Sequence, residues 1–265
     1  MAIIRDPKTG KALVPRKYYK DEYVRVIHST LSRVFNVAIQ QGWIKDNPCK
    51  NAVRPKKNQS NKKPPLQVEQ IKDIIKKTSD FSVTNAVIQF QIYTGLRIGE
   101  TLALTWDDIN FGKRTIKVNK SVTILNKEVL VGPPKTQNSI RTIYMSETIF
   151  NLLKLVKKDQ SRNKSELKNV YVDNNLIFCM PTGEYINRRN ISSRLNTIKK
   201  GTDYEYISVH FLRHANATLL LMNEVDLKIV SAHLGHSDIS IIADVLQEKQ
   251  KYISQLIDLQ FEDDK

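Results

Sequence analysis

The fold is decided by one short stretch, TGLRIGE at residues 94–100, which lies between two runs of helical apolar periodicity. Gly95 is the expected end of the first helix, because glycine adopts a left-handed backbone without steric cost. A second helix then begins at about residue 98, which places Arg97 at its N-terminus, where anions are stabilised. Taken alone, an arginine in such a position is more often a surface or salt-bridge residue.

Further hydrogen-bond donors follow this stretch along the chain. His210 and Arg213 are three positions apart at the start of a helix, so their side chains share one face. Lys135 lies in a loop between two strand-like runs, and His236 follows a glycine that is expected to end a helix. Two arginines can each form forked bonds to one phosphate and neutralise a pentacovalent transition state. The ordered set therefore predicts a site for one phosphate of a nucleic-acid backbone.

Lys135 and His236 each have a plainer interpretation. A lysine at a hairpin tip can protonate a leaving oxygen if neighbouring cations lower its pKa, but it can equally be a nonspecific phosphate contact. His236 can bind the phosphate or merely cap the end of its helix. The presence of the other cations in the same order favours phosphate binding for both.

The charge of the chain points to a polyanionic partner. The 265 residues carry a formal net charge of +15. Residues 1–65 contain 15 Lys+Arg and 4 Asp+Glu, or +11, whereas the other 200 contain 27 and 23, or +4. The excess near the N-terminus is typical of an arm that contacts a phosphate backbone. For residues 1–20 the alternative is a solvated basic surface or a disordered tail.

The chain divides into an N-terminal helical segment (1–49), a linker (50–65) and a main body (66–265). Apolar residues recur at helical spacing from Asp21 to Gln41, and Gly42 is the expected end of that helix. One amphipathic helix cannot bury its own apolar face. We therefore expect this face to pack on the main body, on another chain or on a partner.

The linker is basic, with six Lys/Arg and three Pro and almost no apolar residues. A flexible basic tether suits a protein that wraps around a DNA duplex. We predict contacts with the DNA backbone from its side chains, and a disordered spacer without contacts is the alternative. The residues concerned are Arg54, Lys56, Lys57, Lys62 and Lys63.

The main body is predicted to be an α+β fold, mostly helical, with one small antiparallel sheet. Helical patterns cover about 67–77, 82–94, 98–104, 147–158, 188–199, 211–222, 227–234, 239–246 and, as a tail helix, 250–260. Strand-like segments cover about 109–111, 115–118, 121–125, 128–131, 141–145 and 176–178. Residues 159–175 are polar and are predicted to form a surface loop.

These motifs resemble those of a known family. The stretch TGLRIGE, followed by the pattern LxLxWxD at residues 102–108, resembles the first signature box of the tyrosine recombinases, or phage integrase family. HFLRH at 210–214 and LGHS at 234–237 resemble the second box. The resemblance covers about residues 66–246, the catalytic domain of that family. Residues 20–55 resemble the end of a core-binding domain, so the resemblance implies a truncated core-binding domain.

The resemblance implies a role for each candidate residue. In a family member, Arg97, Arg213 and His236 would hold the scissile phosphate. Lys135 would act as general acid on the 5′ oxygen, His210 would assist proton transfer, and Glu100 would orient the site. The implied reaction is site-specific strand exchange in a phage or mobile element through a 3′-phosphotyrosyl bond. Because that bond preserves the energy of the phosphodiester, neither a cofactor nor a metal ion is implied.

Besides the incomplete core-binding domain, the chain departs from the family pattern at two places. Glu224 stands where the family usually has glycine, and we expect Asn223 to adopt the left-handed conformation instead. The nucleophilic tyrosine is absent from its expected position before Leu246, as if about four residues had been deleted. Tyr252 is the one tyrosine downstream. It is either a displaced nucleophile or a packing residue of the tail helix.

Three functions remain open from the sequence. The first is a recombinase that uses Tyr252. The second is a catalytically inactive DNA-binding remnant, or a competitor of an intact integrase, because donors without a nucleophile bind but do not cut. The third is a relative of type IB topoisomerases, which relax supercoils by the same chemistry.

The expected partner is double-stranded DNA carrying attachment sites, with four subunits needed for recombination and a monomeric free chain. Cys49 and Cys179 are isolated, which argues against a disulfide framework or a metal site. No apolar run approaches the roughly 18 residues of a membrane span. We therefore predict a cytoplasmic protein without a membrane segment.

Overall fold

The computed structural model describes residues 21–52, 63–125, 128–134 and 140–235. The chain forms two compact units, Met1–Lys63 and Pro64–Lys265, and each is described by itself. The tail segments predicted as helices at 239–246 and 250–260 lie outside the described residues.

The first unit is built on one helix, α1 (Asp21–Gln40), with a short 3-10 helix, η1 (Pro48–Asn51), folded back on it. Gly42 has φ +71°, so the predicted left-handed helix end is confirmed. The side-chain amide of Asn47 donates to the Ser32 carbonyl at 3.1 Å, which holds η1 against α1. No residue of α1 is buried among the described residues, and its apolar face remains exposed, for example at Leu31 and Val34.

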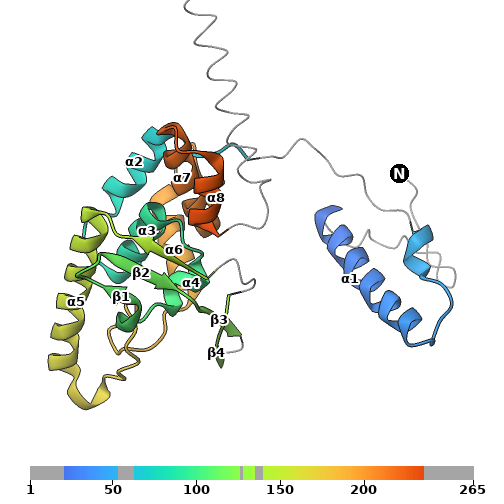
Figure 1. The fold of residues 1–265 in the computed structure, drawn as a ribbon, viewed down its shortest axis with the longest axis horizontal. Helices are drawn as coiled ribbons and strands as arrows, with labels where there is room; N and C mark the ends of the chain where they lie inside the picture. The colour runs from blue at the N-terminus through green and yellow to red at the C-terminus, as the bar shows by residue number, and fades with distance from the viewer. Residues whose placement is uncertain (1–20, 53–62, 126–127, 135–139, 236–265) are drawn as a thin grey trace, which may run out of the picture. The chain divides into compact units, whose positions relative to one another are not determined.

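The second unit is mostly helical, as predicted. Most residues of its α3 are buried, because this helix lies in the centre and packs against α5, α6 and α7 (Figure 1). The helices of this unit among the described residues are α2 (Val68–Lys77), α3 (Val83–Thr94), α4 (Ile98–Ala103), α5 (Glu147–Leu167), α6 (Arg188–Lys199), α7 (Val209–Met222) and α8 (Leu227–Leu234).

The described strands of the second unit form two antiparallel sheets instead of the predicted one. A three-stranded sheet has the order β1 (Ile109–Asn110), β2 (Thr115–Val118), β5 (Arg141–Tyr144), and a hairpin pairs β3 (Ser121–Leu125) with β4 (Glu128–Gly132). The hairpin is inserted in the chain between two strands that pair with each other.

This topology corrects the prediction that Lys135 lies at a hairpin tip. β4 pairs with β3, whereas β5 pairs with β2, in the register Ile116 opposite Ile143. The segment between β4 and β5 therefore connects two sheets. Lys135 itself lies outside the described residues. Sequence periodicity identifies strands, but it does not say which strand is the partner of which.

The predicted loop at 159–175 is wrong over its first half, because α5 continues to Leu167 and a 3-10 helix, η5 (Lys168–Val170), follows it. Gln160 explains the extension. Its side chain is buried, donates to the Leu176 and Ile177 carbonyls and accepts from the Trp106 indole at 2.8 Å. The predicted strand at 176–178 is reduced to an isolated bridge between Leu176 and Thr105.

A second correction concerns the turn after α7. Glu224 itself has φ +61°, and Asn223, which was expected to be left-handed, has φ −90°. The side-chain amide of Asn223 donates to the Leu219 carbonyl at 2.7 Å, which keeps Asn223 at the end of α7. The left-handed residue is therefore the next one, Glu224.

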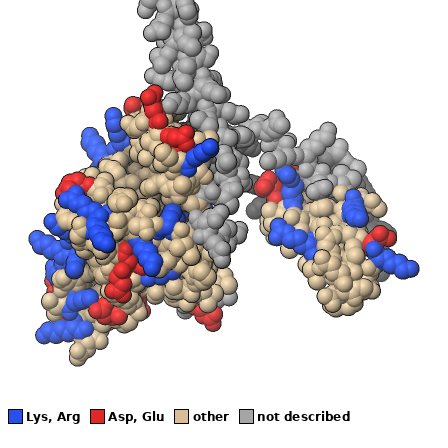
Figure 2. All heavy atoms as spheres, in the orientation of Figure 1, with Lys and Arg blue, Asp and Glu red and all other residues tan. Residues whose placement is uncertain are grey.

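Charged side chains cover much of the second unit, with Lys and Arg most frequent along the edge formed by α5 (Figures 1 and 2). Every described helix is too short or too polar to cross a lipid bilayer.

Candidate phosphate-binding site

The turn between α3 and α4 is the foundation of the candidate site. Gly95 ends α3 with φ +66°, and a Cβ at this position would lie 2.4 Å from Leu234 Cδ2 and 2.6 Å from Asn216 Oδ1. Only glycine therefore lets α7 and α8 approach the turn this closely. Gly99 likewise lets the β3–β4 hairpin approach α4 closely, because a Cβ added at Gly99 would lie 2.6 Å from the Ser121 hydroxyl.

Arg97 follows this turn as the N-cap residue of α4, as predicted. Its guanidinium donates to Glu100 Oε1 at 2.8 Å and to the Gly235 carbonyl at 3.1 Å. The backbone N–H of Arg97 donates to Glu100 Oε2 at 3.0 Å, so the same carboxylate also caps the helix. The Arg97 side chain is 37% exposed and can meet a ligand from solvent.

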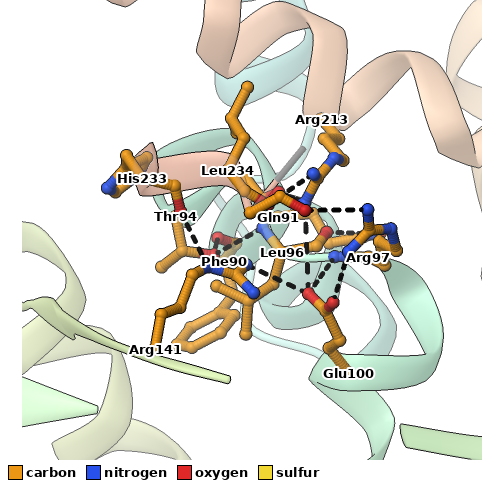
Figure 3. Close-up of polar contacts among 12 residues, drawn as sticks. Phe90, Gln91, Thr94, Leu96, Arg97, Glu100, Arg141, Arg213, His233 and Leu234 are labelled. Atoms are coloured by element: carbon orange, nitrogen blue, oxygen red, sulfur yellow. Dashed lines mark hydrogen bonds and ion pairs between the residues drawn. The ribbon is translucent and has the colours of Figure 1, made fainter. Parts of the chain in front are cut away.

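Glu100 is the carboxylate on which the site converges (Figure 3). It is 1% exposed, and the guanidiniums of Arg97, Arg141 and Arg213 lie 2.8, 3.1 and 4.0 Å from its oxygens. Burial by itself would raise the pKa of this carboxyl, but the charge of Arg141 and hydrogen bonds from Arg141 and Arg97 hold the pKa below its ordinary value. Three cations on one anion leave a positive excess, which suits a phosphate.

Arg213 is the most deeply placed of the three cations, at 1% exposure, in the first turns of α7. It donates to the Gly95 carbonyl at 2.7 Å and to the Leu234 carbonyl at 2.5 Å. Burial and the nearby charge of Arg97 lower the pKa of Arg213 to about 9, which still leaves the side chain protonated at neutral pH.

Arg141 belongs to the site and was missed by the sequence analysis. It is the first residue of β5, is 8% exposed, and donates from Nε to the His233 carbonyl at 2.7 Å and from Nη2 to Glu100 at 3.1 Å. One signal was available. Arg141 and the buried Ile143 are two positions apart in a strand, so they share the inward face.

The three arginines share a second partner, the C-terminal end of α8 (Figure 3). The last carbonyls of a helix lack partners within it and carry partial negative charge. Here three consecutive carbonyls are each bound by a different arginine: His233 by Arg141, Leu234 by Arg213 and Gly235 by Arg97. The end of α8 is thereby attached to α4, β5 and α7.

Comparison with known proteins supports the family resemblance. Residues 64–249 match the family described as "Phage integrase family". The chain belongs to the phage integrase family. It is 30% identical over 260 aligned positions to "Tyrosine recombinase XerC-like" of Caldanaerobacter subterraneus subsp. tengcongensis, which covers 89% of this chain and 66% of that protein. It is also 30% identical to "ICEBs1 integrase" of Bacillus subtilis, over 89% of this chain and 65% of the relative.

This phage integrase family chain thus spans slightly less than two thirds of the length of these two relatives. Its fold is similar to the "Tn1549 transposon Integrase", solved "in complex with circular intermediate DNA", with a TM-score of 0.66 at 20% identity. That alignment covers 89% of this chain and 80% of the other. The predicted α+β, mostly helical fold of this family is confirmed.

His210 lies in the first turn of α7 in this integrase-family chain, with its ring edge-on to His214 at 4.7 Å between centroids. Partial desolvation of the ring and the charges of Arg213 and Arg97 lower the pKa of His210. The residue as a whole is nevertheless exposed to solvent. A neutral imidazole beside cations can accept a proton at neutral pH.

His233 is a second histidine that the sequence did not single out. Burial and the charge of Arg141 lower its pKa, and its Nε2 is buried without a hydrogen-bond partner among the described residues. No sequence signal marked it, because its burial depends on how α8 docks.

The structure therefore brings four predicted residues of this family member to one place: Arg97, Glu100 and Arg213 in direct contact, and His210 beside them. Lys63 is exposed. The other predicted site residues lie outside the described residues, namely Arg54, Lys56, Lys57, Lys62, Lys135, His236 and Tyr252. Among the described residues, no group of three or more His, Cys, Asp and Glu could hold a metal ion.

Proposed function

We propose that this chain acts in site-specific DNA recombination for a phage or mobile element, by strand exchange through a 3′-phosphotyrosyl intermediate. The observation that carries the proposal is the convergence of Arg97 and Arg213 on Glu100 in a member of the phage integrase family. Guanidiniums held in place before a substrate arrives stabilise developing charge without reorganisation.

We assign the phosphate oxygens to Arg97, Arg213 and His236. The nucleophilic tyrosine oxygen attacks phosphorus, the 5′ oxygen leaves, and Lys135 supplies the proton that this oxygen needs. His210 assists proton transfer, in keeping with its lowered pKa and its place beside Arg213. Glu100 orients the two arginines and does not contact DNA. Reversal of the step by a 5′ hydroxyl of another strand completes the exchange.

We propose double-stranded DNA with attachment sites as the partner, bound in part through Arg54, Lys56, Lys57, Lys62 and Lys63. A solved relative, the "Tn1549 transposon Integrase", is described in complex with DNA. Four chains would assemble on DNA for recombination, and the free chain would be a monomer. The cytoplasm, where such DNA is found, is the proposed location.

A second function, DNA binding without cleavage, is favoured by one specific observation. The chain has no tyrosine between His236 and Gln250, so Tyr252 is the single candidate nucleophile downstream of the second box. In this alternative the phosphate site binds but forms no covalent intermediate.

Covalent trapping on a nicked DNA substrate made from the end of the host element tests both functions. Three chains are compared: the natural chain, its Tyr252→Phe variant, and a chain with YTHV inserted between Val245 and Leu246. An adduct from the natural chain that Tyr252→Phe abolishes supports a recombinase with a displaced nucleophile. An adduct from the insertion chain alone supports the binding function. No adduct from any of them contradicts the proposed phosphate chemistry.

A further inference from the structure

Arg141 is the one of the three arginines around Glu100 that comes from a strand, β5. The side chain of Arg97 is 37% exposed, whereas Arg141 is 8% exposed and lies with its Nε on the His233 carbonyl and its Nη2 on Glu100. Figure 3 shows Arg141 between the end of α8 and the Glu100 carboxylate. Arg141 thus joins the end of α8 to Glu100 in α4, from its own place at the start of β5.

We propose that Arg141 is a positioning residue for the phosphate site. It ties the start of β5 and the end of α8 to Glu100, and so fixes where Arg97 and Arg213 lie. It makes no contact with the phosphate. The benefit to catalysis rests on the proposed function, but the positioning itself does not.

Arg141 and the His233 carbonyl that it binds are both close in the chain to candidate catalytic residues. β5 begins six residues after Lys135, and the His233 carbonyl is three residues before His236. Lys135 is therefore close in the chain to Arg141 itself, and His236 is close to the carbonyl that Arg141 binds. Misplacement of a catalytic group by about 1 Å can reduce a rate by about 100-fold.

The contact also requires an arginine. Nε and Nη2 of one rigid, planar guanidinium reach two acceptors on different elements, at 2.7 and 3.1 Å. A lysine carries the same charge as a single flexible ammonium group and does not reproduce this fork. Arg141→Lys therefore keeps the charge and removes the geometry, whereas Arg141→Gln removes both.

Arg114→Gln is the matched control. Arg114 lies just before β2 and forms an ion pair with Glu147 at 2.5 Å, but its side chain is 47% exposed and that of Glu147 is 62% exposed. Both control and test remove one Arg–Glu pair beside the same small sheet. Only Arg141→Gln removes a buried pair whose arginine also binds a carbonyl of α8.

The first measurement follows the pKa of His210 by NMR titration of the histidine rings in the free protein. Arg213 and Arg97 are among the causes that lower this pKa, so it reports whether the two guanidiniums stay in place. We expect Arg141→Lys and Arg141→Gln to raise the pKa of His210 towards its ordinary value, and Arg114→Gln to leave it unchanged. A change in overall stability alone would not move it. An unchanged pKa in folded Arg141→Lys overturns the proposal.

The second measurement is the rate of covalent trapping in the chain with YTHV inserted after Val245. We expect Arg141→Lys and Arg141→Gln to slow trapping by similar factors, about 100-fold, and Arg114→Gln to have no effect. Near-normal trapping with Arg141→Lys but slow trapping with Arg141→Gln would mean that charge at the phosphate is what counts, and would overturn the proposal. If the parent insertion chain forms no adduct, the proposed function fails, and the His210 titration still decides the role of Arg141.

Discussion

Two groups of ion pairs in the second unit differ in almost every respect. Around Glu100, partners from α4, β5 and α7 meet in a buried position, and the residues joined are 41 and 113 positions apart. On α5, exposed Arg162 pairs with Asp159 and Glu166, one helical turn away on either side. The pairs on α5 support a helix that would form without them. The pairs around Glu100 bring separate elements to one point, so their loss should affect both stability and the site.

The largest effect should follow from Glu100→Ala. The carboxylate is 1% exposed and compensates three guanidiniums, and breaking a buried ion pair costs about 3–5 kcal/mol. We expect the free energy of unfolding, measured by urea denaturation, to fall by that amount. Glu147→Ala on the surface should change it by less than about 1 kcal/mol. Equal losses from the two variants would contradict the comparison.

The same carboxylate predicts a pH dependence. The folded-state pKa of Glu100 is lowered, so its contribution to stability is complete above the unfolded-state pKa of about 4.3 and is lost as the pH falls through the folded-state value. Unfolding free energies measured from pH 7 to pH 3 should fall more steeply in the natural chain than in Glu100→Gln. Parallel curves would mean that Glu100 contributes no such linkage.

Gly95→Ala should have the next largest effect. The backbone has φ +66°, and the new Cβ would lie 2.4 Å from Leu234 Cδ2. We expect a loss of about 1–3 kcal/mol in urea denaturation, together with faster hydrogen exchange in α8. Gly201→Ala is the control, because Gly201 also has a positive φ but nothing lies within 4 Å of its Cβ position. If both variants lose the same amount, the close packing of α8 is not what makes Gly95 necessary.

His233 predicts a smaller, pH-dependent effect. Its folded-state pKa is lowered, so its contribution to stability is present above the unfolded-state pKa of about 6.5 and is lost as the pH falls towards the folded-state value. One titrating group changes the free energy of unfolding by at most about 1.4 kcal/mol per pH unit. Urea denaturation between pH 7.5 and 5 should show a weaker slope in His233→Gln. An unchanged slope in His233→Gln would contradict this contribution.

The smallest effect should come from Arg162→Ala. The side chain is 65% exposed and its pairs are local, so we expect a change of less than about 1 kcal/mol in the free energy of unfolding. High salt should remove even this difference, because exposed charges are screened. A loss comparable to that of Glu100→Ala would show that exposure does not separate the two groups.

The sequence predicted the local elements well, because the signals for them are local. Helix ends at Gly42, Gly95 and Gly235 were recognised from glycine itself, and all three have positive φ in the structure. The error in α5 had the opposite cause. Residues 159–167 are polar in sequence, but the buried side chain of Gln160 makes hydrogen bonds that only packing could reveal.

The sequence alone determined the family, the helical character of the main body, and the presence of Arg97, Glu100, His210 and Arg213 at the site, because motif spacing and helix signals depend on neighbouring residues. Tertiary structure alone decided that Arg141 and His233 join that site, and that β4 and β5 belong to different sheets. Those facts depend on contacts between residues far apart in the chain. Burial, which sets the energies of such contacts, exists only once the elements have packed.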